Sequence, residues 1–398
     1  MNQFDNYQIS LFDGDQFNGE NYDDLRVTLE ELHGAVVWGT DWTAETIVNQ
    51  IEKGLIDLSP KFQRREAWDD KRKSAFIESV IAGLPIPQII LAEKKDKKGS
   101  YLVIDGKQRL ISLRRFFSKA DDQVFPALRL KGIELLPDLN NKTFEEICED
   151  AILNDYISQV ENQPIRTIVI KNWPTEEFLY NVFLRLNTGS LPLSTQELRQ
   201  ALHPGPFLDF CDDFSVESQP IKQTLNINAP DYRMRDIELV VRFFAFKYFI
   251  SDYQGNLKSF FDETVNKLNQ SWPQEEVNIV QHAESLNQAI SLCLDIFDRK
   301  PFRKWKDDAF DKRFNRAIYD IMVYYFSNQA IYEAAQNNKE IIKSAFIELC
   351  STDAAFLASF EFSTKNLAPT QYRYRVWGNK LSLVLNIPIA VPVIRNER

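Results

Sequence analysis

Apolar residues recur at helical spacing in two segments early in the chain. One pattern covers about residues 43–55, and Thr43 stands where a capping residue belongs, just before the first apolar position. The second begins after Asp69 or Asp70, which can cap it, and stops at Gly83, a residue type common just past a helix end. These patterns predict two amphipathic helices with apolar faces that pack onto a core.

Strand patterns follow the second helix. Leu84–Pro87 cannot be helical because of its two prolines, and Gln88–Ala92 is an apolar run typical of a buried strand. After a polar loop, Tyr101–Ile104 has the pattern of a returning strand. The segment Asp105–Phe117 then predicts a turn followed by a helix, because its apolar residues have helical spacing.

The remaining patterns complete the predicted fold. A strand is expected over Ile165–Ile170, and helices over residues 176–187, 194–202, 237–248, 283–297, 313–325 and 340–349. Residues 1–24 show no sustained period. We therefore predict an α+β fold in three parts, namely a partly ordered acidic leader (1–42), an α+β domain (43–205) and a mainly α-helical C-terminal domain (206–398).

Composition narrows the class of protein. The 398 residues are 44% hydrophobic with a formal net charge of −10, as expected for a globular protein. No apolar run is as long as a membrane span, and the N-terminus lacks an export signal, so we expect a cytoplasmic protein without a membrane partner. The four cysteines lie far apart and only three histidines are present. This pattern predicts buried thiols, with neither a structural zinc site nor disulfides.

Charge is distributed unevenly along the chain. Residues 1–50 carry ten acids against one base, whereas residues 51–119 carry sixteen bases against nine acids. The overall negative charge argues against a protein that coats nucleic acid. The basic segment nevertheless provides local positive charge for binding phosphate.

The most specific chemical signal is Asp105-Gly106-Lys107-Gln108-Arg109, where a strand runs into a helix. A helix start exposes N–H groups and the positive end of the helix dipole, which together bind phosphate. Gly106 lets the backbone approach a ligand, and Lys107 and Arg109 add positive charge. Asp105 can hold a metal ion or orient a water. The alternative is a plain turn followed by solvated bases on a helix surface.

Two further segments gain meaning from their order in the chain. Phe62–Trp68 contains Gln63 and Arg64, which can donate to phosphate, and two aromatic rings that can stack on a base. The alternative is an exposed charged loop anchored by Trp68. Pro85-Ile86-Pro87 fixes the backbone before the strand. The three elements in this order are a stronger signal than any one of them.

This order resembles the N-terminal domain family of the GmrSD type IV restriction endonucleases, which has a ParB/sulfiredoxin-like core and a signature close to Asp-Gly-Gln-Gln-Arg. The matching elements are Phe62-Gln63-Arg64 with Trp68, Pro85-Ile86-Pro87, Asp105–Arg109, Val182–Gly189, and Leu193-Ser194 with Glu197-Leu198-Arg199. The resemblance covers about residues 45–210 with ordered motifs.

The resemblance implies that the domain over 43–205 is ParB/sulfiredoxin-like. It also implies that this domain binds and hydrolyses a nucleoside triphosphate, ATP or GTP, with Mg²⁺, coupled to defence against phage or modified foreign DNA. By position, the catalytic role falls to Asp105, Gln108 and Arg109, with Asp105 also the metal ligand. Nucleotide or phosphate binding is implied for Gln63, Arg64, Pro87, Gly106, Lys107 and Asn187.

Two departures from the family pattern change the expectation. Lys107 replaces the first Gln of the signature, and a cation there suits phosphate binding while altering how a water is positioned. Many relatives carry a second nuclease domain with a His-x-x-Pro element, and no histidine of this chain stands in one. We therefore expect no HNH-type cleavage by this chain and a separate nuclease or effector subunit as partner.

Two basic, aromatic segments are candidates for nucleic-acid contact. One supplies Arg303 and Lys304, and the other supplies Arg373 and Arg375. For the second segment the alternative is an amphipathic core element with exposed arginines.

Three functions are compatible with the sequence. The leading one is a nucleotide-binding and NTP-hydrolysing module of a prokaryotic anti-phage defence system, which the basic segment 51–119 favours. The second is a non-enzymatic DNA-binding or sensing adaptor that recruits a separate effector. The third is a phosphotransferase that passes a γ-phosphate to a hydroxyl.

Overall fold

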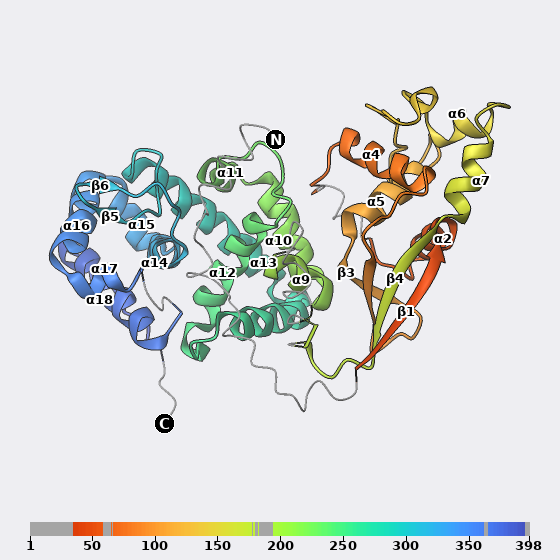
Figure 1. Cartoon of the computed structure of the whole chain (residues 1–398). Coiled ribbons are helices and arrows are strands. Elements are labelled where there is room, and N and C mark those ends of the chain that lie inside the picture. Colours follow the sequence, from red (N-terminus) through yellow and green to blue (C-terminus); the bar gives the residue numbers. More distant parts are fainter. Residues whose placement is uncertain are drawn as a thin grey trace. The chain divides into compact units, whose positions relative to one another are not determined.

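The computed structural model describes residues 35–58, 65, 67–176, 178, 179, 182, 194–361 and 365–394. Contacts between Cα atoms divide the chain into two compact units with a boundary between Leu202 and His203. We call the described residues before this boundary the sheet unit and those after it the helical unit. The first combines a small mixed sheet with helices and the second is mostly helical (Figure 1), which confirms the predicted α+β class.

The sheet unit is built on four strands in the order β1-β4-β2-β3. Their bounds are β1 (Val36–Thr43), β2 (Ile89–Glu93), β3 (Tyr101–Asp105) and β4 (Pro164–Lys171). β2 and β4 are parallel, whereas β1 with β4 and β2 with β3 are antiparallel. The strands predicted from apolar runs are therefore confirmed, and β2 and β3 form a hairpin.

β1 is an element that the sequence analysis does not predict, because it assigns these residues to the leader. β1 pairs with β4 from Val36 opposite Lys171 to Thr43 opposite Pro164. The residues from Val36 to Gly39 are all exposed. Apolar and polar positions consequently do not alternate as they do in a half-buried strand, and the usual signal is missing. The ordered part of the predicted leader thus includes an edge strand.

The sheet unit contains several helices, and two of them begin where the capping signals at Thr43 and Asp69 predict, whereas the two between residues 144 and 162 are not predicted. Their bounds are α2 (Ala44–Glu52), α4 (Asp70–Ile81), α5 (Lys107–Phe116), α6 (Phe144–Cys148), α7 (Asp155–Asn162) and α9 (Thr195–Leu202). The Thr43 side chain accepts a hydrogen bond from the backbone of Thr46 at the start of α2, and Asp69 caps α4. Gly83, just past α4, has a φ of 66°, as a glycine after a helix end should. The helix predicted over 176–187 lies mostly outside the described residues.

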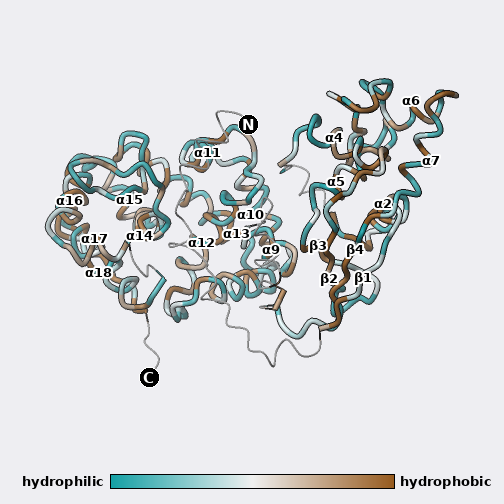
Figure 2. The backbone as a smooth tube through the Cα atoms, viewed as in Figure 1, coloured by the Kyte–Doolittle hydropathy of each residue, from teal (hydrophilic) through white to brown (hydrophobic). Residues whose placement is uncertain are grey.

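The sheet is covered on both faces. Ile89 and Leu91 of β2 belong to one apolar cluster with residues of α2, α4, α5 and α7, whereas Ile90 and Ala92 belong to a second cluster with Leu198 of α9. Hydrophobic residues accordingly concentrate along the strands of the sheet (Figure 2). A strand buried on both faces needs a continuous apolar run, which is the pattern that predicts β2.

The helical unit contains the predicted helices, and one of them, α13 (Leu257–Ile296), is much longer than the sequence pattern predicts. Its elements are α10 (Pro206–Glu217), α11 (Gln219–Leu225), α12 (Arg235–Phe249), α13 (Leu257–Ile296), the short hairpin strands β5 (Trp305–Lys306) and β6 (Ala309–Phe310), α14 (Arg316–Phe326), α15 (Gln329–Gln336), α16 (Lys339–Thr352), α17 (Ala354–Ala358) and α18 (Leu367–Leu385). In α13 only the C-terminal part is predicted, because buried residues are interrupted between Leu268 and Ile279 and the apolar period is lost there.

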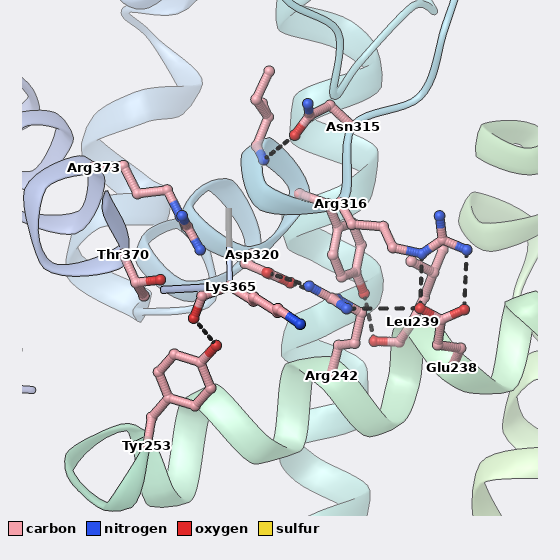
Figure 3. Close-up of polar contacts among 12 residues, drawn as sticks. Glu238, Leu239, Arg242, Tyr253, Asn315, Arg316, Asp320, Lys365, Thr370 and Arg373 are labelled. Carbon is pink, nitrogen blue, oxygen red and sulfur yellow. Dashed lines mark hydrogen bonds and ion pairs between the residues drawn. The ribbon is translucent and has the colours of Figure 1, made fainter. Parts of the chain in front are cut away.

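A buried network of charges joins α12 to α14 in the core of the helical unit (Figure 3). The Arg242 guanidinium donates to both carboxylate oxygens of Asp320, at 2.9 and 2.6 Å, and both side chains are almost completely buried. Arg316 donates to Glu238 at 2.7 and 3.1 Å. Burial alone would lower the pKa of Arg242, but the charge and hydrogen bonds of Asp320 raise it above its ordinary value. Arg242 therefore stays charged inside the core.

Two smaller expectations can be compared with the structure. Cys211, Cys293 and Cys350 are buried free thiols, whereas Cys148 is exposed at the end of α6, so the prediction of burial is wrong for this residue. Its position on a short surface helix of five residues explains the exposure. Within the described ranges, no helix is both long and apolar enough to span a membrane.

We predict that Asp320→Ala lowers the free energy of unfolding by about 3–5 kcal/mol. It removes the carboxylate that forms both hydrogen bonds with the buried Arg242 guanidinium and leaves only Glu238, whose Oε1 lies 3.6 Å from Nη1. The matched control is Asp252→Ala, which removes an ion pair with Lys267 whose two side chains are each 47% exposed. The control should cost less than about 1 kcal/mol. Denaturant unfolding followed by circular dichroism measures both changes. Equal, small losses would contradict the structural role of the network.

Candidate functional site

The segment Asp105–Arg109 forms a tight junction between β3 and α5, which we call the β3–α5 turn. β3 ends at Asp105, and Gly106 has a φ of 98° at the N-cap of α5. A Cβ atom at Gly106 would lie 3.2 Å from Nη2 of Arg109 and 3.2 Å from Cγ1 of Ile89. Both the left-handed conformation and the crowding require glycine here. The predicted strand–turn–helix arrangement is thus confirmed.

Arg109 connects three segments at this turn. Its Nη2 donates to Oδ2 of Asp105 at 2.7 Å and to the carbonyl of Gln88 at 3.0 Å. Its side chain is 10% exposed and that of Asp105 is 26% exposed. The buried Nε of Arg109 has no hydrogen-bond partner among the described residues. Arg109 therefore joins the end of β3 to the residue just before β2, and one of its buried donors is left without an acceptor.

Gln108 connects the turn to the loop that precedes α4. Its Oε1 accepts a hydrogen bond from the backbone N–H of Trp68 at 3.2 Å. The Trp68 ring packs edge-on against Phe76, with the Arg72 guanidinium 5.1 Å from the ring centre. The hydrogen bond thus ties the Trp68 backbone, shortly before the start of α4, to α5.

Three of the predicted ligands, Gln63, Arg64 and Asn187, lie outside the described residues. Pro87 is exposed and directly precedes Gln88, whose carbonyl accepts from Arg109. The proline pair consequently fixes an oxygen that helps to hold the turn. In this way the structure brings together Pro87, Asp105, Gly106, Gln108 and Arg109.

Glu197 is a site residue that sequence reasoning missed as a partner of the turn. Its Oε1 accepts from Nζ of Lys107 at 3.3 Å, and the two side chains are 7% and 9% exposed. Its Oε2 accepts from the backbone N–H of Ser194 at 2.7 Å, while the Ser194 hydroxyl accepts from the Glu197 backbone at 3.1 Å. Ser194-x-x-Glu197 is therefore a capping box at the start of α9.

The capping box could be identified from sequence, but its position beside Lys107 could not, because ninety residues separate the two side chains. Lys107 already has a carboxylate partner in this structure. A bound phosphate would have to share the Lys107 ammonium with Glu197. The contact also explains why a lysine is tolerated in the turn, since a buried charge needs a paired charge.

Asp105 is the candidate metal ligand, and the described residues contain no cluster of three or more His, Cys, Asp or Glu side chains that could hold an ion by itself. Only Oδ2 of Asp105 is taken by Arg109, so its second oxygen is available. Mg²⁺ is commonly held by one or two carboxylates, with waters and phosphate oxygens completing its shell. The residues present therefore fit a Mg²⁺ ion that arrives with a nucleotide.

The residues predicted to contact nucleic acid differ in their exposure and in their partners. Arg373 is 2% exposed and donates to the carbonyl of Ser359 at 3.4 Å, so the prediction that it contacts nucleic acid is wrong. It lies on the inner face of α18 (Figure 3), where burial lowers its pKa. Arg375, on the same helix, is exposed. Lys304 pairs with Glu361 at 3.2 Å, and Arg303 donates to the carbonyl of Asp311 at 3.5 Å.

Comparison with known families agrees with the resemblance. Residues 44–204 match the family model described as "GmrSD restriction endonuclease, N-terminal domain". The match includes the β3–α5 turn and the Ser194–Glu197 capping box. Comparisons with curated proteins and with solved structures gave no match.

We predict that Gly106→Ala lowers the free energy of unfolding of the sheet unit more than Gly99→Ala does. Both glycines have positive φ, 98° and 77°, so both variants incur backbone strain of about 1–2 kcal/mol. A Cβ at Gly99 meets nothing within 4 Å, whereas at Gly106 it presses on Arg109 and Ile89. Denaturant titration of the two variants measures the difference. Equal losses would show that the turn is not closely packed.

Proposed function

Because residues 44–204 are a GmrSD restriction endonuclease N-terminal domain, we propose that the β3–α5 turn binds the phosphates of a nucleoside triphosphate and hydrolyses it with Mg²⁺. The matched family model is that of a restriction endonuclease domain, which supports a role for the chain in a restriction-type defence system. The observation that carries the proposal is the Arg109 guanidinium, held at the turn by Asp105 and the Gln88 carbonyl, with its Nε lacking a hydrogen-bond partner among the described residues.

Phosphate binding is supported by three features of the turn. Gly106 adopts the left-handed conformation that turns the end of β3 into α5, and its missing Cβ lets the Arg109 guanidinium lie against the backbone of the turn. The N–H groups of the first turn of α5 point along the positive end of the helix dipole, and no side chain caps them. Arg109 adds a fixed positive charge whose fork matches the geometry of phosphate oxygens.

Hydrolysis is supported by the two polar groups beside this anion site. Mg²⁺ held by Asp105 would neutralise charge on the phosphates during transfer to water. Gln108 holds its amide oxygen on the Trp68 backbone, which fixes the side chain and leaves its amide nitrogen to orient a water. Arg109 would stabilise the charge that develops as the bond between the γ-phosphorus and the bridging oxygen breaks.

The surroundings of Lys107 weaken the attraction of the turn for a triphosphate. Its pairing with Glu197 reduces the net positive charge that the turn offers to a triphosphate. Because of this pair, a non-enzymatic role is the second candidate function. The domain would then be a nucleotide-sensing or DNA-binding adaptor that recruits a separate nuclease or effector. Binding would then occur without turnover.

We predict that Asp105→Asn abolishes phosphate release from ATP or GTP, a loss of about a hundredfold or more, because the metal ligand is removed. The control is Asp96→Asn, which makes the same change at an exposed loop position and should leave release unchanged. Release is measured with Mg²⁺, with and without DNA, and the unfolding midpoint confirms that both variants are folded.

Normal turnover by folded Asp105→Asn protein would refute the catalytic assignment. If the wild-type protein releases no phosphate but binds nucleotide or DNA, the adaptor replaces the hydrolase as the function of this domain.

A further inference from the structure

A small polar pocket lies in the helical unit, and it is lined by none of the residues used in the proposed hydrolysis. Its volume is about 170 Å³, and it is formed where the C-terminal end of α11 meets the loop that follows α13. The polar side chains that line it include Gln223, Thr224, Asn226, Arg299, Lys300 and Arg303. A volume of this size accommodates one tetrahedral anion with a few waters.

Three cations line this pocket without a carboxylate partner. Arg299 donates to the side-chain oxygen of Gln223 at 3.0 Å, and Arg303 donates to a backbone carbonyl at 3.5 Å. Within the described part of the chain, neither arginine nor Lys300 forms an ion pair. The one acid that lines the pocket, Asp298, is paired with Lys343 at 2.5 Å. The pocket therefore has uncompensated positive charge.

Thr224 supplies an independent sign of an absent ligand. Its side chain lines the pocket, the residue is 8% exposed, and its Oγ1 is buried with no hydrogen-bond partner among the described residues. Buried hydroxyl groups in folded proteins nearly always have a partner. A ligand oxygen or a water in the pocket would satisfy this hydroxyl.

The loop that carries the cations also has an unusual backbone. Asp298, Arg299 and Phe302 have φ values of 49°, 64° and 59°, in the left-handed region that residues other than glycine seldom adopt. The Arg299 N–H donates to the carbonyl of Leu294 at 2.7 Å, which fixes the loop against the end of α13. A strained but anchored loop holds its side chains in a preformed arrangement.

We propose that this pocket binds a phosphate group, either of a nucleic-acid backbone or of a free phosphate or nucleotide. Three cations and a buried hydroxyl donor surround a cavity of the size of one such group, and arginine forks match phosphate oxygens. The site is independent of the proposed hydrolysis, because none of its residues belongs to the β3–α5 turn. It replaces Arg373 as the position in the helical unit where a phosphate is expected.

Alternatively, the same cations serve only to stabilise the fold. The pocket lies at the C-terminal ends of α11 and α13, where positive side chains stabilise the helix dipole without any ligand. In that case their removal would lower stability and leave phosphate binding unchanged. The experiment must therefore measure ligand binding at this site separately from stability.

The test is hydrogen–deuterium exchange of the full chain, titrated with inorganic phosphate or with a short DNA duplex at constant ionic strength. We expect phosphate to slow amide exchange in residues 219–227 and 297–304. In the Arg299→Gln/Arg303→Gln double variant, the phosphate concentration that gives half of the maximal protection should rise about tenfold or more, because charge-assisted hydrogen bonds are lost. Lys300→Gln, at an exposed position, should give a smaller shift without affecting folding.

The matched control is Arg313→Gln, which removes the same charge at an exposed position nearby that does not line the pocket. Its titration should stay within about twofold of wild type. If DNA protects these segments at a lower concentration of phosphate groups than inorganic phosphate does, the ligand is a nucleic-acid backbone. Protection by inorganic phosphate alone would identify a small ligand. No protection in these segments, or equal protection in the Arg299→Gln/Arg303→Gln protein, would overturn the proposal.

Discussion

One guanidinium holds the candidate site together. Arg109 binds the carboxylate at the end of β3 and the carbonyl that precedes β2, so two segments separated in sequence are fixed beside the start of α5. The crowded Gly106 is a consequence, because its backbone must pass close to Arg109. The proposed chemistry depends on the same contact, since an arginine already oriented loses little conformational freedom when phosphate binds.

Buried ion pairs have a different use in each unit. In the sheet unit, Lys107 and Glu197 connect the turn to α9, and the capping box of α9 fixes the carboxylate. In the helical unit, Arg242 and Asp320 are nearly inaccessible and join two core helices (Figure 3). Such pairs specify which helices meet, although their net contribution to stability is modest. Charges that lack partners, as around the pocket beside Thr224, are therefore informative exceptions.

Much of the fold could be predicted from sequence because burial leaves a periodic pattern. The capped helices and β2 follow this rule, and the glycine turn was identified from residue type alone. β1 could not be predicted, because an exposed edge strand has no apolar alternation. The pairing of Glu197 with Lys107 depends on tertiary contact over ninety residues. Arg373 shows the converse error, since a charged residue was assigned to the surface and is buried.

The central claim is that Arg109 both builds the turn and contacts phosphate. The most direct measurement is calorimetric binding of a non-hydrolysable ATP analogue with Mg²⁺ to the wild-type protein and to Arg109→Lys, which keeps the charge but loses the fork. Arg129→Lys, at a 43% exposed position, is the control. We expect the affinity to fall roughly tenfold or more in folded Arg109→Lys protein and to stay unchanged in Arg129→Lys protein. Equal affinity in all three proteins would contradict the central claim.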